Sequence, residues 1–414
     1  TAGLCSMGAK VIPLGVVPTP AVAYLTRYYK ADAGVVISAS HNPCEYNGIK
    51  FFNSDGYKLS DGIENEIESY ILGEKAIEEL PTHGKVGYVS ANHNAVEDYV
   101  AFAVSTIDCR LDGMKIAVDC ANGASYETAF KALNKLGANV EAIHNTPDGV
   151  NINHMCGSTH MESLQAYVTS IGADIGIAFD GDADRMLAVD ENGKLIDGDQ
   201  IMAACAKFMR DNGTLKQNTL VATVMSNLGL FMAGEKIGIN IPRTKVGDRY
   251  VLEEMLAKGY NIGGEQSGHI IFLDHNTTGD GLVSALQFLS VLKKTGMKAS
   301  EAASIVTVMP QVLRNAVVKL ENKNSYMENE EIAAACKALE DEFAGEGRVL
   351  IRPSGTEPLV RVMIEGKDEE YITKKAIAEN ANSMILLADH SKFGRISLMT
   401  YSPMEKLDAI VTDQ

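Results

Sequence analysis

The sequence lacks three features that would assign it to common classes of protein. No apolar run approaches the roughly 20 residues that a membrane-spanning helix needs, and no signal peptide opens the chain. No Cys-x-x-Cys pair occurs among its seven scattered cysteines, so neither a disulfide framework nor a zinc site is indicated, and we expect reduced, mostly buried thiols. A cytoplasmic location is the default expectation.

Positive charge is also too scarce for a protein that binds nucleic acid. The chain has 37 Lys and Arg residues against 54 Asp and Glu residues, which gives a net charge of −17. Such a surface repels nucleic acids and anionic membranes, so we expect neither as a partner. It disfavours anionic substrates as well. An enzyme with this charge that binds phosphate must therefore gather its cations locally.

The length and the hydrophobic pattern indicate an α/β protein of several domains. At 414 residues the chain is too long for one hydrophobic core. Short apolar runs alternate with amphipathic stretches of helical length, which is typical of βαβ units. We expect buried strands at 10–17 and 34–38, and further strands at 114–119, 139–143, 174–179, 186–189, 194–196, 219–224, 316–319, 348–351 and 360–365. Helices are expected at 20–30, 64–72, 93–104 and 330–343, and another helix after the strand 114–119 is expected to end at about residue 136.

The chain starts at Thr1 without an initiator methionine and enters at once what resembles a helix end that leads into a strand. Its first residues therefore look like the middle of a domain. We expect a fragment whose first domain lacks its amino-terminal part.

The first motif with chemical potential is Ser38-Ala39-Ser40-His41-Asn42-Pro43, which follows the strand expected at 34–38. Loops at the carboxyl ends of strands are where α/β folds place their sites. The Ser40 hydroxyl beside the His41 imidazole and the Lys50 ammonium has the parts of a nucleophile with proton-transfer and charge-balancing groups. A plain turn serine is an equal alternative, because Ser and Asn before Pro are common in turns.

The second motif has three carboxylates at every second position, Asp180, Asp182 and Asp184, between two apolar strands. Carboxylates spaced in this way can turn toward one hard cation. An EF-hand is excluded because Arg185 stands at the sixth loop position and the flanks are strands. A solvated acidic turn is the alternative, but the loop is held between two buried strands. The open coordination positions favour magnesium in a phosphoryl-transfer site over structural calcium.

Two further loops carry polar side chains among glycines. The segment 263–269, Gly-Gly-Glu-Gln-Ser-Gly-His, suits sugar hydroxyls, although an ordinary glycine-rich turn competes for the same residues. The segment 352–358, Arg-Pro-Ser-Gly-Thr-Glu-Pro, forms an anion cradle together with Arg361, with an ordinary Pro/Gly loop as the alternative. The two arginines supply the local positive charge that the acidic total requires. Together the four motifs predict phosphoryl transfer on a phosphosugar.

These motifs, in this order, resemble those of the α-D-phosphohexomutase superfamily, over residues 1 to about 377. The resemblance implies three consecutive mixed-sheet α/β domains and a smaller C-terminal α+β domain around a central cleft. The implied domains are a phosphoserine domain at 1–106, a metal-binding domain at 107–204, a sugar-binding domain at 205–308 and a phosphate-binding domain at 309–377.

The resemblance also implies a role for each motif. Ser40 is expected to carry a phosphate in the resting enzyme and, together with Asp180, Asp182 and Asp184, to hold Mg²⁺. His41, Lys50 and Arg185 are expected to transfer protons and stabilise charge at the same place. The residues implied in substrate binding are Gly247, Asp248, Arg249, Glu265, Ser267, Arg352, Ser354, Gly355, Thr356 and Arg361.

Finer matches resemble the bacterial phosphoglucosamine mutases. They are the segments 151–153 and 156–160, the loop 244–250, and Gln266, where the phosphomannomutase/phosphoglucomutase branch usually carries Met. The implied reaction interconverts glucosamine 6-phosphate and glucosamine 1-phosphate through a bound 1,6-bisphosphate, for UDP-N-acetylglucosamine and cell-wall synthesis. A phosphomannomutase/phosphoglucomutase, or an inactive fragment that binds phosphosugar, are the alternatives. The expected partners are a small phosphosugar and, if the chain is not a monomer, a second copy in a homodimer.

Residues 378–414 do not resemble a mutase. The segments 384–395 and 407–413 resemble the end of the effector-binding domain of DeoR-type transcriptional repressors. A stretch of about 35 residues is too short for a core of its own. We therefore expect a foreign, loosely docked tail that arose by joining or fusion.

Overall fold

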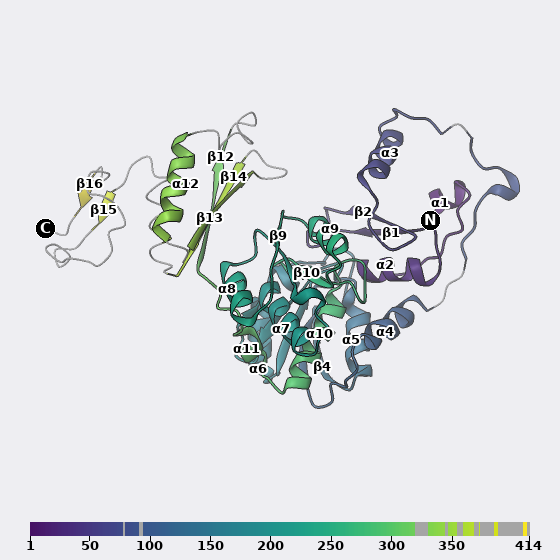
Figure 1. The fold of residues 1–414 in the computed structure, drawn as a ribbon. Coiled ribbons are helices and arrows are strands. Elements are labelled where there is room, and N and C mark those ends of the chain that lie inside the picture. Colours follow the sequence, from purple (N-terminus) through teal and green to yellow (C-terminus); the bar gives the residue numbers. More distant parts are fainter. Residues whose placement is uncertain are drawn as a thin grey trace. The chain divides into compact units, whose positions relative to one another are not determined.

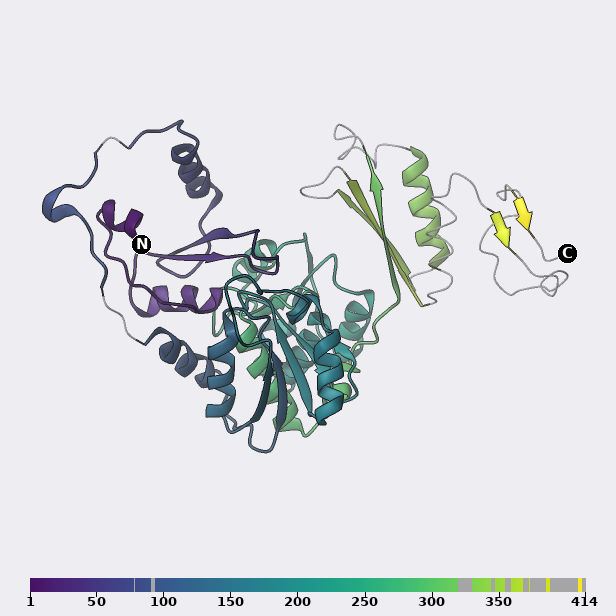
Figure 2. The ribbon, with the colours of Figure 1, turned by 180° about the vertical axis from the view of Figure 1, so that it is seen from behind.

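The structure, a computed structural model, describes residues 1–77, 79–90, 94–318, 330–343, 347–353, 359–367, 372, 385–387 and 409–411. The chain forms two compact units, drawn in Figures 1 and 2. The first comprises Thr1–Ser226 and Leu230–Val306, and the second comprises Asn227–Gly229 and Thr307–Gln414. No helix in the described ranges is both long and apolar enough to cross a membrane.

A two-stranded antiparallel hairpin and one covering helix carry the serine motif. Strand β1 (Ala33–Ser38) pairs with β2 (Gly48–Asn53), and helix α2 (Thr19–Tyr28) packs on the hairpin (Figure 1). A Cβ atom at Gly34 would lie 2.2 Å from the Thr26 hydroxyl oxygen, so this close approach of strand and helix requires glycine. The other helices here are α1 (Ala2–Ser6), α3 (Asp61–Ile71), the 3₁₀ helix η1 (His83–Lys85) and α4 (Ala95–Ser105).

Two expectations about this segment are wrong. The described part of 10–17 contains no strand and forms only one β-bridge, between Val11 and Val89, because an extended run becomes a strand only where a partner lies alongside it. The strand 34–38 is not buried on both faces, since 70% of the Ile37 surface is exposed while Gly34 is buried. Alternate residues of a strand point to opposite faces, and α2 covers only one face of the hairpin.

A five-stranded sheet carries the acidic motif. Its strand order is β4-β3-β5-β6-β7, in which β4, β3 and β5 are parallel, β6 is antiparallel to β5, and β7 is antiparallel to β6. The side chains of Ile116 and Val118 enter one hydrophobic cluster and that of Ala117 enters another, so apolar layers lie on both faces. The elements are β3 (Lys115–Asp119), α5 (Ser125–Lys135), β4 (Asn139–Ile143), η2 (Gly157–Thr159), α6 (Glu162–Ile171), β5 (Ile175–Phe179), β6 (Met186–Asp190) and β7 (Leu195–Ile196).

A four-stranded sheet of order β11-β10-β8-β9 follows, in which β10, β8 and β9 are parallel and β11 is antiparallel. One continuous hydrophobic cluster contains residues from Val17 to Val306, so the α2 segment, the five-stranded sheet and the four-stranded sheet contribute to a shared core. The elements are α7 (Gly198–Asp211), η3 (Lys216–Asn218), β8 (Val221–Thr223), α8 (Leu228–Ile237), β9 (Arg243–Thr244), α9 (Asp248–Lys258), β10 (Ile262–Gly264), β11 (Ile270–Phe272), α10 (Gly281–Thr295) and α11 (Ala299–Ala303).

The second unit contains a three-stranded antiparallel sheet of order β12-β14-β13, with the helix α12 (Glu330–Phe343) packed on β13. The strands are β12 (Gln311–Val317), β13 (Gly347–Pro353) and β14 (Leu359–Gly366). Within the expected tail, the described residues form a parallel pair, β15 (Ile385–Leu387) and β16 (Ala409–Val411). The expected fold class, three α/β domains followed by a smaller domain with an antiparallel sheet, is confirmed.

Candidate active site

Ser40 lies two residues beyond the end of β1 with its backbone in the left-handed region, at a φ of 56°. A residue other than glycine incurs a strain of about 1–3 kcal/mol in such a sparsely populated conformation unless its surroundings impose it. The Ser40 amide donates to the Ser38 hydroxyl oxygen at 2.9 Å, and the Ser40 hydroxyl oxygen lies 3.5 Å from Nδ1 of His41. The loop thus presents a half-buried hydroxyl beside an imidazole.

The acidic motif forms the loop between β5 and β6, and its three carboxylates are buried, with at most 6% of each residue exposed. Each uses one oxygen within the protein. Oδ1 of Asp180 accepts from the Arg185 amide, and Oδ2 of both Asp182 and Asp184 accepts from Lys50. The other oxygen of each has no hydrogen-bond partner among the described residues.

These three carboxylates fit a hard divalent cation. One ligand oxygen from each lies within 4.8 Å of the others, and carboxylate oxygens are the donors that Mg²⁺ and Ca²⁺ prefer. Burial and the charges of Asp184 and Asp182 raise the pKa of Asp180 well above its ordinary value. A cluster whose own repulsion disfavours full ionisation is stabilised by a bound cation. The three carboxylates therefore constitute a possible metal site.

Lys50 compensates part of this negative charge. It lies on β2, and its Nζ atom is 2.6 Å from Oδ2 of Asp182 and 3.2 Å from Oδ2 of Asp184. Burial by itself lowers the pKa of the Lys50 ammonium, but the two carboxylates raise it above its ordinary value, so this side chain stays charged. For Asp184, burial raises the pKa, but the charges of His269, Lys50 and Arg185 outweigh it and lower the pKa.

The structure therefore brings together residues from the serine and acidic motifs. Arg185 adds a second cation, with its Nε atom 3.9 Å from Oδ1 of Asp184. Burial and the charge of Arg185 lower the pKa of His41, which favours a neutral imidazole beside Ser40.

Two residues that touch this site, Thr19 and Asn153, were not predicted as site residues. The Thr19 hydroxyl donates to Oδ2 of Asp182 at 2.6 Å, and the Thr19 amide donates to the Asp182 carbonyl at 2.9 Å. The Asn153 side chain donates to the backbone of the Ser40 loop. Thr19 opens α2 between two prolines, which is a recognisable helix start. That signal predicts a helix, and nothing in it predicts a contact with Asp182.

The glycine-rich segment lies between β10 and β11 and meets the loop at 244–250. Oε1 of Glu265 accepts from the Gly247 amide at 3.1 Å, which joins two of the predicted substrate-binding residues. Ser267 is exposed, and Gln266 donates to Oδ2 of Asp197 at the start of α7. The Gln266 side chain thus forms a hydrogen bond with the residue that caps the N-terminus of α7.

Charged pairs tie this loop to the first segment of the chain. Asp248 forms an ion pair with Lys58, and Arg249 forms one with Asp61 of α3. Burial raises the pKa of Asp248, but the charges of His269 and Lys58 outweigh it and lower the pKa to about 2. Asp248 is therefore ionised at every physiological pH.

In the second unit, Arg352 of β13 stands directly opposite Arg361 of β14 in the antiparallel register. Like charges in this arrangement repel each other, so an anion that binds between two such side chains relieves the repulsion. Of the other residues predicted to cradle a phosphate, Ser354, Gly355 and Thr356 lie outside the described residues.

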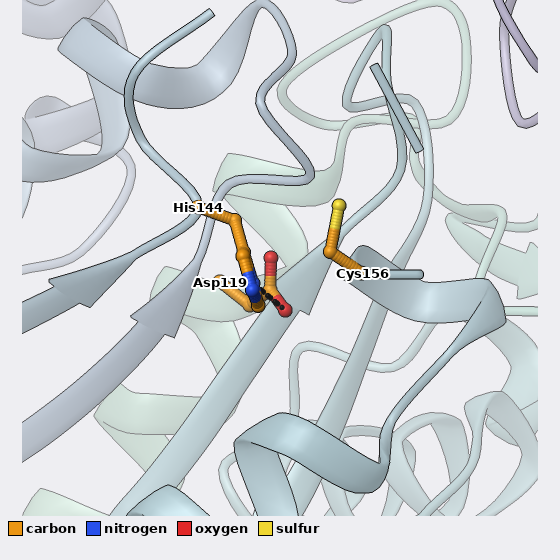
Figure 3. Close-up of side chains that lie close together, drawn as sticks. All are labelled: Asp119, His144 and Cys156. Atoms are coloured by element: carbon orange, nitrogen blue, oxygen red, sulfur yellow. Dashed lines mark hydrogen bonds and ion pairs between the residues drawn. The ribbon is translucent and has the colours of Figure 1, made fainter. Parts of the chain in front are cut away.

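A second group of possible ligands, Asp119, His144 and Cys156, lies at the carboxyl edge of the five-stranded sheet (Figure 3). Its carboxylate is already engaged, since Oδ1 accepts from the Ala121 amide and Oδ2 from the Gly157 amide, with Nδ1 of His144 at 2.9 Å. Figure 3 shows Cys156 without a bond to either neighbour. Burial raises the pKa of its thiol to about 12, and the thiol form is a poor metal ligand. We interpret the group as an anchor for the surrounding loops.

Free thiols were expected, and the six cysteines whose side chains the structure describes are all free. Three of them, Cys120, Cys156 and Cys205, are buried, and the other three are partly exposed.

Comparisons with known proteins agree with the geometry. Family models described as phosphoglucomutase/phosphomannomutase match the chain in four consecutive parts: alpha/beta/alpha domain I at 1–78, domain II at 96–193, domain III at 197–309 and the C-terminal domain at 316–382. A phosphoglucosamine mutase of Ruminiclostridium cellulolyticum is 63% identical over 374 residues, which cover 90% of this chain and 83% of that protein. One of Acetivibrio thermocellus is 62% identical over 376 residues, covering 91% and 84%.

The chain belongs to the phosphoglucosamine mutases of the α-D-phosphohexomutase superfamily. It is thus a phosphohexomutase, an isomerase, as expected.

Solved structures show the same fold at low identity. A phosphoglucomutase/phosphomannomutase family protein of Burkholderia thailandensis aligns with a TM-score of 0.72 at 23% identity, over 90% of this chain and 82% of that chain. The Aspergillus fumigatus N-acetylphosphoglucosamine mutase in complex with GlcNAc-6P and magnesium aligns with a TM-score of 0.62 at 19% identity, over 85% and 89%. The mutase fold is therefore preserved in sequences that have diverged widely.

A model of the DeoR C-terminal sensor domain matches residues 358–414. It covers the tail in which the sequence analysis found a DeoR resemblance, and it overlaps the mutase C-terminal domain over residues 358–382. Apart from β15 and β16, residues 378–414 lie outside the described residues.

The unpartnered oxygens of the acidic loop lead to a first prediction. Asp180→Asn should weaken Mg²⁺ binding and cut turnover by about 100-fold or more, since it removes a charged ligand. Without metal, its thermal midpoint should be equal to or above that of the wild type, because the raised pKa of Asp180 means that its charge opposes folding. Calorimetric titration with Mg²⁺ and thermal unfolding in EDTA measure the two effects.

Asp190→Asn is the matched control. Asp190 is also buried, but Oδ1 accepts from the Asn192 and Lys194 amides. This variant should bind Mg²⁺ normally and should not be stabilised. A metal-free Asp180→Asn protein that unfolds several degrees below the wild type would contradict the interpretation.

The Asp119–His144 pair leads to a prediction on pH dependence. The hydrogen bond that the His144 ring donates to the Asp119 carboxylate raises the pKa of His144 above 6.5, against the opposing effect of burial. A raised folded-state pKa contributes stability that is fully present below pH 6.5 and is lost as the pH rises through the folded value. His144→Gln should therefore destabilise the protein by about 1 kcal/mol at pH 5.5 and by less at pH 9.

Calorimetry at both pH values tests this point, with His160→Gln as the control. His160 is a partly exposed histidine of the same segment, and its Nδ1 atom lies beside the Thr159 hydroxyl. An effect of His144→Gln that is equal at the two pH values would show that the charged form of His144 contributes nothing.

Proposed function

We propose that this mutase interconverts glucosamine 6-phosphate and glucosamine 1-phosphate through a phosphoserine at Ser40. The observation that carries the proposal is the contact between the two motifs, in which Lys50 and Thr19 bind the carboxylates of the acidic loop next to Ser40. Relatives of about 60% identity that bear the name phosphoglucosamine mutase support the amino sugar as the substrate.

The chain's own residues can move the proton that leaves the sugar hydroxyl during phosphoryl transfer. In one half-reaction the P–O bond to the Ser40 hydroxyl oxygen breaks as a sugar hydroxyl oxygen bonds to phosphorus. The proton of that sugar hydroxyl ends on Ser40, and the imidazole of His41, 3.5 Å away and favoured in its neutral form, carries it. The second half-reaction is the reverse at the other end of the sugar. The 1,6-bisphosphate is the intermediate and also the primer that phosphorylates Ser40.

Asp180, Asp182 and Asp184 would hold Mg²⁺, together with a phosphate oxygen on Ser40. Mg²⁺ bound there would supply the positive charge that phosphoryl transfer requires. Lys50 and Arg185 offset part of the negative charge of the three carboxylates, and Lys50 fixes the orientation of two of them.

We assign binding of the sugar hydroxyls to Glu265 and Ser267, together with the loop that contains Gly247, Asp248 and Arg249. The phosphate that does not react is assigned to Arg352 and Arg361, with Ser354, Gly355 and Thr356. Two arginines that stand opposite each other on neighbouring strands suit a dianion better than a neutral sugar. The corresponding domains are 1–106, 107–204, 205–308 and 309–377, followed by the tail 378–414.

A coupled assay tests the proposal directly. Conversion of glucosamine 1-phosphate to glucosamine 6-phosphate is followed with Mg²⁺ and a glucose 1,6-bisphosphate primer, beside glucose 1-phosphate and mannose 1-phosphate. A clear preference for the amino sugar is the expected result. Preference for glucose or mannose would make the chain a phosphoglucomutase/phosphomannomutase in substrate choice. Binding without turnover of any sugar, by folded protein, would make it a phosphosugar-binding fragment.

Ser40→Ala should abolish turnover and leave phosphosugar affinity within about twofold, because it removes the phosphoryl carrier and no anion-binding side chain. Turnover is measured in the coupled assay, and affinity by calorimetry. The control is Ser54→Ala, which changes an exposed serine in the turn after β2. Turnover by Ser40→Ala at the wild-type rate would rule out the phosphoserine mechanism.

Arg352→Lys should raise KM by about tenfold and change kcat less, since lysine keeps the charge and loses the two-pronged hydrogen bonding to phosphate. Steady-state kinetics separates the two constants. Arg314→Lys on β12 is the control, because Arg314 is exposed and lies on the same sheet. An unchanged KM for Arg352→Lys would mean that the phosphate binds elsewhere.

A further inference from the structure

Asn153 lies 113 residues beyond Ser40 in the sequence, yet its side chain contacts the backbone of the Ser40 loop. Its Nδ2 atom donates to the Ser40 carbonyl at 2.8 Å and to the Asn42 carbonyl at 2.7 Å. Only 6% of Asn153 is exposed. Because both partners are carbonyl oxygens, only the amide nitrogen can serve them, and its two hydrogens are both used.

Asn153 is itself fixed to the five-stranded sheet. Its backbone N–H donates to the Ala121 carbonyl, just beyond β3, at 2.9 Å. Its φ of 58° is one that Asn adopts more readily than most residues. Four residues further on, the Gly157 amide donates to the buried Asp119 carboxylate. The side chain of Asn153 therefore projects from a loop that is anchored on both sides.

The Ser40 carbonyl and the side-chain amide of Asn153 both lie against the acidic loop. A Cβ atom at Gly181 would lie 2.5 Å from the Ser40 carbonyl oxygen and 2.7 Å from Nδ2 of Asn153. Gly181 stands between Asp180 and Asp182 in the sequence, so the nucleophile loop, the amide and the carboxylates are in close contact. A shift of the Ser40 peptide would move its hydroxyl relative to all three carboxylates.

We propose that Asn153 is a positioning residue for phosphoryl transfer, one that holds Ser40 in its left-handed conformation against the acidic loop; the inference rests on the proposed function. A backbone at a φ of 56° relaxes unless neighbouring contacts impose it, and the two hydrogen bonds from Asn153 impose it on the carbonyls of Ser40 and Asn42. Phosphoryl transfer depends on alignment of the attacking and leaving oxygens, so a nucleophile that drifts loses rate rather than affinity.

The chemistry of the position distinguishes asparagine from side chains of similar size. The substitution Asn153→Asp would turn two attractions into two repulsions, since a carboxylate would face two carbonyl oxygens in almost the same volume. Glycine at this position tolerates the positive φ and removes the side chain altogether. Asn153→Asp and Asn153→Gly thus separate loss of the donor from backbone strain.

The experiment measures kinetics and local hydrogen exchange on Asn153→Asp, Asn153→Gly and the control Asn151→Asp. Asn151 lies in the same loop, but its side chain bonds to Thr146 and Asp148 and not to the Ser40 loop. Both variants at 153 should lower kcat by about 10- to 100-fold with KM within about threefold. The backbone amides of the segment 38–43, in which Pro43 has no amide hydrogen, should exchange faster in these variants, with Asn151→Asp close to the wild type in both respects.

A folded Asn153→Asp protein with wild-type kcat would overturn the inference, and so would unchanged exchange at 38–43. The exchange measurement needs no turnover, which separates the inference from the proposed function. If the wild type converts no sugar phosphate, the proposed function fails. Faster exchange at 38–43 in both variants at 153 would then still establish that Asn153 holds the loop.

Discussion

Three carboxylates buried in one short loop impose the constraint that organises this enzyme. Asp180, Asp182 and Asp184 are almost inaccessible, and each keeps one oxygen without a hydrogen-bond partner among the described residues. Buried like charges are unfavourable unless opposite charge lies close by. The protein supplies two cations, Lys50 and Arg185, and the carboxylate oxygens without partners form a possible site for a metal ion that would supply the rest of the positive charge.

The residues that bind the acidic loop also attach the α2 helix and the β1–β2 hairpin to the five-stranded sheet. Lys50 comes from β2, and Thr19 comes from the start of α2; both bind Asp182. The elements that flank Ser40 are thus attached to the acidic loop by the contacts that neutralise it. Asn153 adds a third attachment, directly to the Ser40 backbone. The acidic loop and Asn153 therefore together hold the Ser40 loop in place.

Much of this could be predicted from the sequence because the signals are local. The helix at 330–343 and the strand at 139–143 have the expected bounds, since periodicity and the composition of a single segment decide them. The acidic loop was identifiable because its three carboxylates fall within five consecutive residues. The run at 10–17 shows the limit of this approach. Its apolar pattern is that of a strand, but strand formation depends on a partner, and the described structure provides only the Val11–Val89 bridge.

The sequence by itself determined the family, the order of the motifs and the kind of chemistry, because those depend on which residue types stand close together along the chain. Only the tertiary structure decided which residues from distant parts of the sequence contact the motifs. Thr19 and Asp182 are 163 positions apart, Asn153 and Ser40 are 113 apart, and Arg352 faces Arg361 only through the register of β13 and β14. Such contacts leave no local pattern, since they arise from how a shared core packs helices and strands against one another.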